Sequence, residues 1–438
     1  MSGPGQPASG PGKPELVSGP IYVATFDAFR GAAVLAIAVY HLFIRSEWVP
    51  TGQLPRAFLT SGFMSLDLLF LISGFVMFLP VAARGTLGDL RAFALRRVAR
   101  IAPAYYVSLL VLIAVWPLVT NGPVPGPEPW EPLPLLWHVL FLQNEVALGY
   151  PAYFPGFAVN PALWTLSVEM VFYVVLVIVA GAYLRRPWLG LAIGIAVTVC
   201  WRLALDPPHD YFQNAFAPSD LHLIWKQFPL FAVDFAAGMT AAWALVRLRR
   251  GVEPERARRL AAPVAGVSLL LFLALMALVG YWTTPSTDPI AIAGAGFQEP
   301  VSLAIAVPLV FAVFAVATDF VSPRLSRPLT HPLSRGLGEI SYSVYLYHLI
   351  VIQLCVVSLD FPTDGHPVDF LRLAAVVLPV SIALGWVSYV LVERPARRYA
   401  QRLSRRIRER AGERVRPAGA GAIAAPTPGS GEAPRAGS

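Results

Sequence analysis

Apolar residues form ten long runs along the chain, separated by short polar or proline-rich stretches. A helix that crosses the hydrocarbon core of a bilayer needs about 20 mainly apolar residues. The last run, LAAVVLPVSIALGWVSYVLV, contains no charged residue. The pattern therefore predicts an all-α polytopic membrane protein, a bundle of about ten transmembrane helices with spans near 28–45, 62–82, 101–120, 163–184, 187–203, 226–246, 260–282, 300–318, 338–358 and 373–392.

The ends of the chain differ in composition from the predicted transmembrane domain at 21–392. Residues 1–20 are rich in Gly, Pro and Ser, lack the features of a signal peptide, and predict a disordered N-terminal tail. Residues 393–416 contain ten arginines and predict a basic cytoplasmic helix against anionic lipid headgroups. The Ala-, Gly- and Pro-rich residues 417–438 predict a second disordered tail.

The connection at 121–162 is much longer than the others and contains nine prolines. Connections of this length usually have a function. Its second half, LLWHVLFLQNEVAL, is apolar enough to predict a helix at the outer interface that roofs a cavity.

Basic residues indicate how the bundle is oriented. The predicted loops at 83–100, 185–186, 247–259 and 319–337 contain 16 Lys and Arg residues, whereas the alternate loops contain five. Because cytoplasmic loops of membrane proteins are enriched in Lys and Arg, both termini are predicted to be cytoplasmic. We expect a multi-pass protein of the bacterial cell membrane.

Composition excludes several classes of protein. The chain is 56% hydrophobic and only 14% charged, with a mean hydropathy of +0.59, whereas a soluble domain has about 25% charged residues. The net charge of +8 could indicate nucleic acid as a partner, but the arginines gather in the loops, so we expect none. Both cysteines, Cys200 and Cys355, lie in apolar runs, which excludes a Cys-rich metal site, and no metal is expected.

Few ionisable side chains fall inside the predicted spans. Such groups are costly in the hydrocarbon region, so each is a candidate functional residue unless a structural partner explains it. The candidates are Arg30, His41, Asp67, Glu169, Asp234 and His348.

Spacing along the helices predicts how these groups are distributed in depth. At a rise of about 1.5 Å per residue, His41 lies roughly 16 Å above Arg30. Asp67 and Glu169 each fall about 10 Å below the outer surface, at the depth of His41. Arg30 instead gathers with Arg97 and Arg100 near the cytoplasmic face. This arrangement predicts a site for a long anionic molecule that stands upright in the bundle.

The residue types favour acyl transfer. A guanidinium group is a forked donor that matches phosphate. Histidine is the most common general base, and a neighbouring carboxylate, Glu169 or Asp67, would fix the tautomer of His41. No nucleophilic side chain of the protein is needed.

Six sequence blocks resemble the signatures of a known family. They are FDAFRGAAVLAIAVYH at 26–41, SLDLLFLISGFVM at 65–77, RRVARIAPAYY at 96–106, LWTLSVEMVFY at 163–173, ISYSVYLYH at 340–348 and VERPARR at 392–398. Together they resemble the integral-membrane acyltransferase family 3, the bacterial acyl-CoA-dependent O-acyltransferases. The resemblance covers about 27–398. The absence of a soluble hydrolase-like domain after the last span resembles the stand-alone members.

The resemblance implies transfer of a short acyl group from acyl-CoA, a co-substrate rather than a permanently bound cofactor, to a hydroxyl of a sugar. The acceptor would be a polysaccharide unit or a glycosylated antibiotic such as a macrolide sugar. His41 is then essential, and Arg30, Arg97 and Arg100 bind the donor. His348, Tyr345 and Ser341, all in the ninth span, are additional candidate site residues.

Two alternatives remain open from the sequence. His41 could either activate the acceptor directly or take the acyl group covalently before passing it on. A proton-coupled transporter or flippase for a carbohydrate or lipid-linked substrate would use His41, Glu169 and Asp234 as a proton relay. Membrane lipid is a partner in every case.

Overall fold

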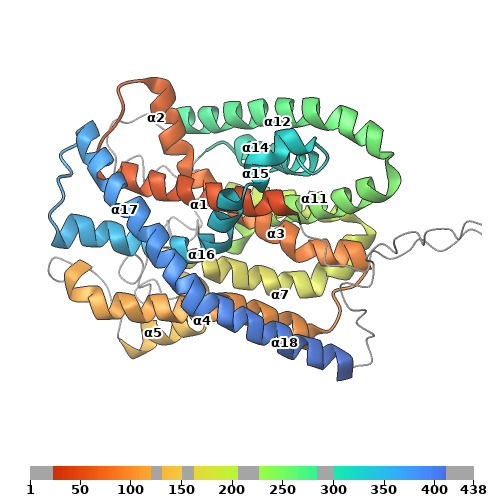
Figure 1. The fold of residues 1–438 in the computed structure, drawn as a ribbon, viewed down its shortest axis with the longest axis horizontal. Coiled ribbons are helices and arrows are strands. Elements are labelled where there is room, and N and C mark those ends of the chain that lie inside the picture. Colours follow the sequence, from red (N-terminus) through yellow and green to blue (C-terminus); the bar gives the residue numbers. More distant parts are fainter. Residues whose placement is uncertain (1–22, 120–130, 150–161, 206–225, 284–298, 411–438) are drawn as a thin grey trace, which may run out of the picture.

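The computed structural model describes residues 23–119, 131–149, 162–205, 226–283 and 299–410, and these segments are helical apart from their connections. Most of the long helices run along the horizontal direction of Figure 1, with α12 at the upper edge and α4 and α18 at the lower edge. The helices are α1 (Ala24–Arg45), α2 (Gln53–Thr60), α3 (Ser65–Arg84), α4 (Leu90–Val119), α5 (Pro132–Val139), α6 (Gln143–Gly149), α7 (Trp164–Arg185), α8 (Pro187–Leu205), α11 (Ala232–Gly251), α12 (Pro254–Trp282), α14 (Val301–Ala317), α15 (Pro323–Thr330), α16 (Pro332–Gln353), α17 (Pro367–Ser388) and α18 (Arg394–Arg410).

The transmembrane class predicted from the sequence is confirmed. Within the described segments, nine helical stretches are long and apolar enough to cross a membrane, and α14 is a shorter apolar helix of 17 residues. Each predicted span coincides with one of these ten, including the short run that forms α8. The cytoplasmic placement of both termini stays a prediction, as do the two tails, which lie outside the described residues.

The predicted loop at 83–100 is wrong over most of its length, because α4 already begins at Leu90. Gly85 ends α3 in the left-handed conformation, with a φ of 82° that glycine adopts without strain. The carboxylate of Asp89 then accepts a hydrogen bond from the backbone N–H of Ala92 at 2.7 Å and starts the next helix. The arginines of the R-x-x-R block therefore lie on a rigid helix.

The basic segment after the last span is helical where the structure describes it. It follows α17 through a π-helical turn at Tyr389–Glu393 and continues as α18. The hydroxyl of Ser404 donates a hydrogen bond to the carbonyl of Ala92, so α18 packs along the basic start of α4 (Figure 1). Helix α18 therefore contacts the rest of the protein, whereas its contact with lipid headgroups stays a prediction.

Close helix approaches fix the geometry around the bundle centre. A Cβ at Gly338 of α16 would lie 2.0 Å from the carbonyl oxygen of Asp27 on α1, and a Cβ at Gly238 of α11 would lie 2.0 Å from that of Leu71 on α3. Only glycine permits such contacts. Both α1 and α3 are therefore held against their neighbours with little freedom to shift or rotate.

Candidate functional site

A narrow cavity of about 90 Å³ lies between α1, α3, α4, α7 and α16, and we call it the central pocket. Its α3 wall runs from Leu66 to Met77, a rise of about 16 Å. The pocket therefore extends along the helices, like the upright site that the sequence predicts.

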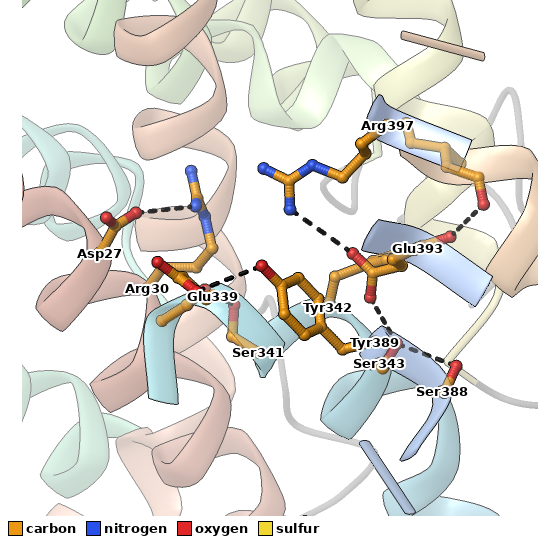
Figure 2. A network of polar contacts seen from close by, with 12 residues as sticks. Asp27, Arg30, Glu339, Ser341, Tyr342, Ser343, Ser388, Tyr389, Glu393 and Arg397 are labelled. Carbon is orange, nitrogen blue, oxygen red and sulfur yellow. Dashed lines mark hydrogen bonds and ion pairs between the residues drawn. The ribbon is translucent and has the colours of Figure 1, made fainter. Parts of the chain in front are cut away.

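Three arginines line the central pocket, Arg30 from α1 and Arg97 and Arg100 from α4. The structure thus brings together the residues that the sequence groups as the donor site. Asp27 lies one turn before Arg30 and forms an ion pair with it at 3.4 Å (Figure 2). The Arg97 guanidinium lies 5.8 Å from the centre of the Phe93 ring. Both contacts hold long side chains in place.

Glu169 also lines the central pocket, on its α7 wall. It accepts hydrogen bonds from the hydroxyl of Ser73, at 2.7 Å, and from the hydroxyl of Tyr173. Ser73 and Tyr173 are further site residues that sequence reasoning missed, although both lie in the blocks quoted above. The carboxylate therefore lies among hydroxyl groups and near the arginines.

His41 pairs with another histidine rather than with a carboxylate. Its Nδ1 lies 3.0 Å from Nε2 of His348, which is fully buried, while His41 is partly exposed. Nδ1 of His348 lies 2.6 Å from the carbonyl oxygen of Tyr345. The ring of Tyr345 in turn lines the central pocket, and its hydroxyl interacts with Thr165. Three of the ninth-span candidates thus lie at the site, since Ser341 is also a lining residue.

The tautomers of the histidine pair follow from this chain of contacts. A carbonyl oxygen only accepts, so Nδ1 of His348 must carry the proton that bonds Tyr345. With His348 neutral, its Nε2 is then an acceptor, and the hydrogen between the rings belongs to Nδ1 of His41. The remaining nitrogen of His41, Nε2, has a lone pair and can take a proton.

Asp67 lies in a different place from the depth-based prediction. It interacts electrostatically with Glu299 and Arg202, and Asp234 interacts with the same residues. Asp67 and Gly74 are seven residues apart and so share a face of α3, and Gly74 packs on the backbone of Phe235 in α11. The predicted equal depth of Asp67 and Glu169 is wrong, because Glu169 bonds Ser73, which lies about 9 Å further along α3 than Asp67. The two carboxylates also face different neighbours.

The residues around Asp67 form what we call the charge cluster: Asp67, Arg202, Asp234 and Glu299, all almost completely buried. Arg202 donates hydrogen bonds to the carboxylate and the carbonyl of Glu299. Burial raises the pKa of Glu299, which precedes α14. Arg202 and Glu299 were not candidates in the sequence, because each was assigned to a loop or to the end of a span.

A second cavity of about 490 Å³ adjoins the central pocket, and we call it the vestibule. The two share Arg30, Arg100 and Tyr342 as walls. Figure 2 shows part of the vestibule, including Glu393, which lies near Arg397. The sequence blocks contain these last two residues but assign them no role.

The described part of the long connection, residues 131–149, packs against the beginning of α7. It contains two short helices, α5 and α6, instead of the single helix predicted, since the chain turns at Phe141 with a positive φ of 59°. The side-chain amide of Asn144 donates to the carbonyls of Trp164 and Lys226, both at 2.9 Å. Burial lowers the pKa of Lys226 to about 8, and its ammonium lies 5.7 Å from the centre of the Trp164 ring.

No group of three His, Cys, Asp or Glu side chains suited to a metal ion occurs in the part of the chain that the structure describes. Five arginines line the two cavities, which suits a phosphorylated molecule.

Comparison with known proteins gives a family but no structural relative. No solved structure matches the chain. The chain is 23% identical over 395 residues to the peptidoglycan O-acetyltransferase OatA of Listeria monocytogenes, covering 86% of this chain and 56% of that protein. It is 26% identical over 397 residues to the acyltransferase MdmB of Streptomyces mycarofaciens, covering 87% of this chain and 93% of that protein.

The individual relatives and the family profile are covered to different extents. The chain spans little more than half the length of several curated relatives that it matches. The family profile, in contrast, covers nearly all of the membrane part: the acyltransferase domain matches residues 23–390. This chain therefore belongs to the acyltransferase 3 family, as a multi-pass membrane protein.

Proposed function

We propose that the protein transfers a short acyl group from acyl-CoA to a hydroxyl of a sugar. The observation that supports this most is the histidine pair, in which Nε2 of His41 can take a proton and His348 contacts Tyr345, a lining residue of the pocket that also contains three arginines. Family membership favours acyl transfer over the alternative of proton-coupled transport. The name of OatA, a peptidoglycan O-acetyltransferase, supports a sugar-containing acceptor.

In this proposal the donor enters at the arginine end. Its phosphates bind Arg97, Arg100 and Arg30, and its pantetheine arm extends along the narrow central pocket toward Tyr345. Arg30, Val34 and His41 lie on one face of α1, because they are four and seven residues apart. A donor that follows this face from Arg30 reaches the histidine pair with its thioester end.

The reaction then needs one base. Nε2 of His41 removes the proton of the acceptor hydroxyl, and the oxygen attacks the thioester carbon. The new C–O bond forms as the C–S bond breaks, and the imidazolium returns the proton to the departing thiolate. His348 holds the ring of His41 in the required tautomer, the role that the sequence assigned to a carboxylate.

Glu169 has a positioning role in this scheme. It accepts hydrogen bonds from Ser73 and Tyr173 and interacts electrostatically with Arg97. Glu169 thereby holds the arginine side chains of the central pocket in position and offsets part of their positive charge. Asp67 belongs to the charge cluster, and we propose that it stabilises the bundle rather than acting on substrate.

The test uses purified protein in nanodiscs with acetyl-, propionyl- and longer acyl-CoA and a panel of peptidoglycan fragments and glycosylated macrolides. We expect coenzyme A release that depends on an acceptor, falls with chain length and is lost in His41→Ala. Protein that binds an acceptor but releases no coenzyme A from any donor would contradict the proposal and favour transport. An acyl label on His41 after incubation with donor alone would replace direct transfer by a covalent relay.

A further inference from the structure

The vestibule is lined by one more arginine than the donor site predicted from the sequence. Four arginines line it, from four different helices: Arg30 of α1, Arg100 of α4, Arg335 of α16 and Arg397 of α18. Arg30 and Arg100 also line the central pocket, whereas Arg335 and Arg397 line only the vestibule. The two cavities therefore form a path with an arginine pair at their junction and a second pair beyond it.

The carboxylates of the vestibule already have partners. Asp27 pairs with Arg30 at 3.4 Å, and Glu339 accepts a hydrogen bond from the hydroxyl of Tyr389 at 3.2 Å (Figure 2). Glu393 is buried and accepts a hydrogen bond from Ser343. These contacts position the side chains around the cavity and reduce the repulsion that an incoming anion would meet.

Arg397 forms an ion pair that holds its side chain near the cavity but leaves hydrogen-bond donors unused. Its Nη1 lies 3.9 Å from Oε2 of Glu393, one helical turn earlier, which is an ion pair without a hydrogen bond. A guanidinium group has five N–H donors, so Arg397 retains donors for a second anion. Its side chain is 35% exposed, and its positive charge interacts with that of Arg30.

The order of groups along a coenzyme A molecule matches the order of the cavities. The thioester and the pantetheine arm come first, then the diphosphate, and last the adenosine with its 3′-phosphate. The central pocket, at about 90 Å³, is narrow, whereas the vestibule, at about 490 Å³, has room for a nucleoside. With the diphosphate at the junction, the 3′-phosphate would lie in the vestibule.

We propose that Arg335 and Arg397 bind the 3′-phosphate of the donor and thereby select coenzyme A thioesters over carriers that lack this phosphate. This inference rests on the proposed function and adds two specificity residues from helices that the donor assignment did not include. A dianionic phosphate is matched by two guanidinium groups, each of which can form charge-assisted hydrogen bonds.

Equilibrium binding tests the proposal without requiring an acceptor. We would measure the affinities of coenzyme A and 3′-dephospho-coenzyme A for the full chain in nanodiscs of phosphatidylcholine only, so that no anionic lipid competes. The variants are Arg335→Gln and Arg397→Gln. The matched control is Arg259→Gln, whose side chain is 81% exposed on α12, away from both cavities.

Wild-type protein should bind coenzyme A at least about tenfold more tightly than the dephospho form. Each vestibule variant should weaken coenzyme A binding by about tenfold to a hundredfold and change dephospho-coenzyme A binding by less than about threefold. The control should change neither. Unchanged binding of the dephospho form also shows that a variant is folded.

Other results would overturn the inference. Equal wild-type affinities for the two ligands, or equal losses for both in Arg335→Gln and Arg397→Gln, would exclude recognition of the 3′-phosphate while leaving the proposed function intact. Wild-type protein that binds neither ligand would contradict the donor assignment itself, and the inference would fail with it. The two failures are therefore distinguishable in one experiment.

Discussion

The central pocket and the charge cluster both place ionisable groups inside the bundle, on different faces of α3. In the pocket, Glu169 accepts hydrogen bonds from two hydroxyls and faces a cavity. In the cluster, Arg202 pairs with Glu299, and Asp67 and Asp234 are buried without lining any of the cavities described above. A buried charge that borders a cavity can act on a ligand, whereas one enclosed by packed helices can only act on the protein.

Among the substitutions that compare the two regions, replacement of His41 should have the largest effect on the reaction. Replacing His41 with Ala removes the proposed base and should lower kcat for acyl transfer by about 10²- to 10⁴-fold. The measurement is acceptor-dependent release of coenzyme A, with the melting temperature as a control for folding. A variant that keeps more than a tenth of wild-type kcat would contradict the role of His41 as base.

In the charge cluster, the largest expected effect is on stability. Arg202→Met leaves the buried carboxylate of Glu299 without its cation, and losing one partner of a buried pair typically costs about 3–5 kcal/mol. We expect that loss in the free energy of unfolding, measured by denaturant titration in micelles, with kcat per folded molecule unchanged.

The double variant Arg202→Met/Glu299→Leu is the matched control. It removes both charges together, so most of the lost stability should return, since apolar replacement of a buried pair is often neutral. If the double variant were as unstable as the single one, the loss would come from packing of the Arg202 side chain or from Asp67 and Asp234, which also interact with Arg202, instead of from the uncompensated charge of Glu299.

The fold was more predictable from the sequence than the site. Each of the ten apolar runs corresponds to an apolar helix in the described segments, because a helix needs about 20 apolar residues to cross the bilayer. Arg30, Arg97 and Arg100, which the sequence groups by their expected depth, line one cavity, and Arg97 and Arg100 share a face of α4 because they are three residues apart.

The partner of His41 could not be predicted in the same way. Residue number gives depth only when the position at which each helix enters the bilayer is known, and the direction of a side chain depends on how its helix is rotated. For α3, close packing against α11 at Gly74 and Gly238 determines that rotation. Asp67 therefore faces α11, and His348, given only as an additional candidate, occupies the place expected for a carboxylate. Arg397 was unassigned because its approach to the site depends on α18 packing along α4.

Glu169→Gln tests whether the pocket carboxylate acts through charge or through shape. The amide keeps the size of the side chain and can still accept hydrogen bonds from Ser73 and Tyr173, but the negative charge near Arg97 is lost. We expect kcat/KM for the donor to fall by about tenfold, mainly through KM, because the arginine end is less well positioned. A fall of a thousandfold in kcat alone would instead identify Glu169 as a group that acts on the reacting atoms.

The smallest effect is expected for Asp67→Asn, and it would separate the two regions most directly. Asn has the same shape, and the change removes one negative charge from a cluster in which Asp67, Asp234 and Glu299 already repel one another. We therefore expect kcat to stay within about threefold of wild type and the free energy of unfolding to change by less than about 1 kcal/mol. Both are measured on the same nanodisc and micelle preparations as the variants above. A hundredfold loss of kcat in a stably folded Asp67→Asn protein would mean that the charge cluster is coupled to the reaction, since Leu66 beside it lines the central pocket, and the division between a working cavity and an enclosed structural cluster would no longer hold.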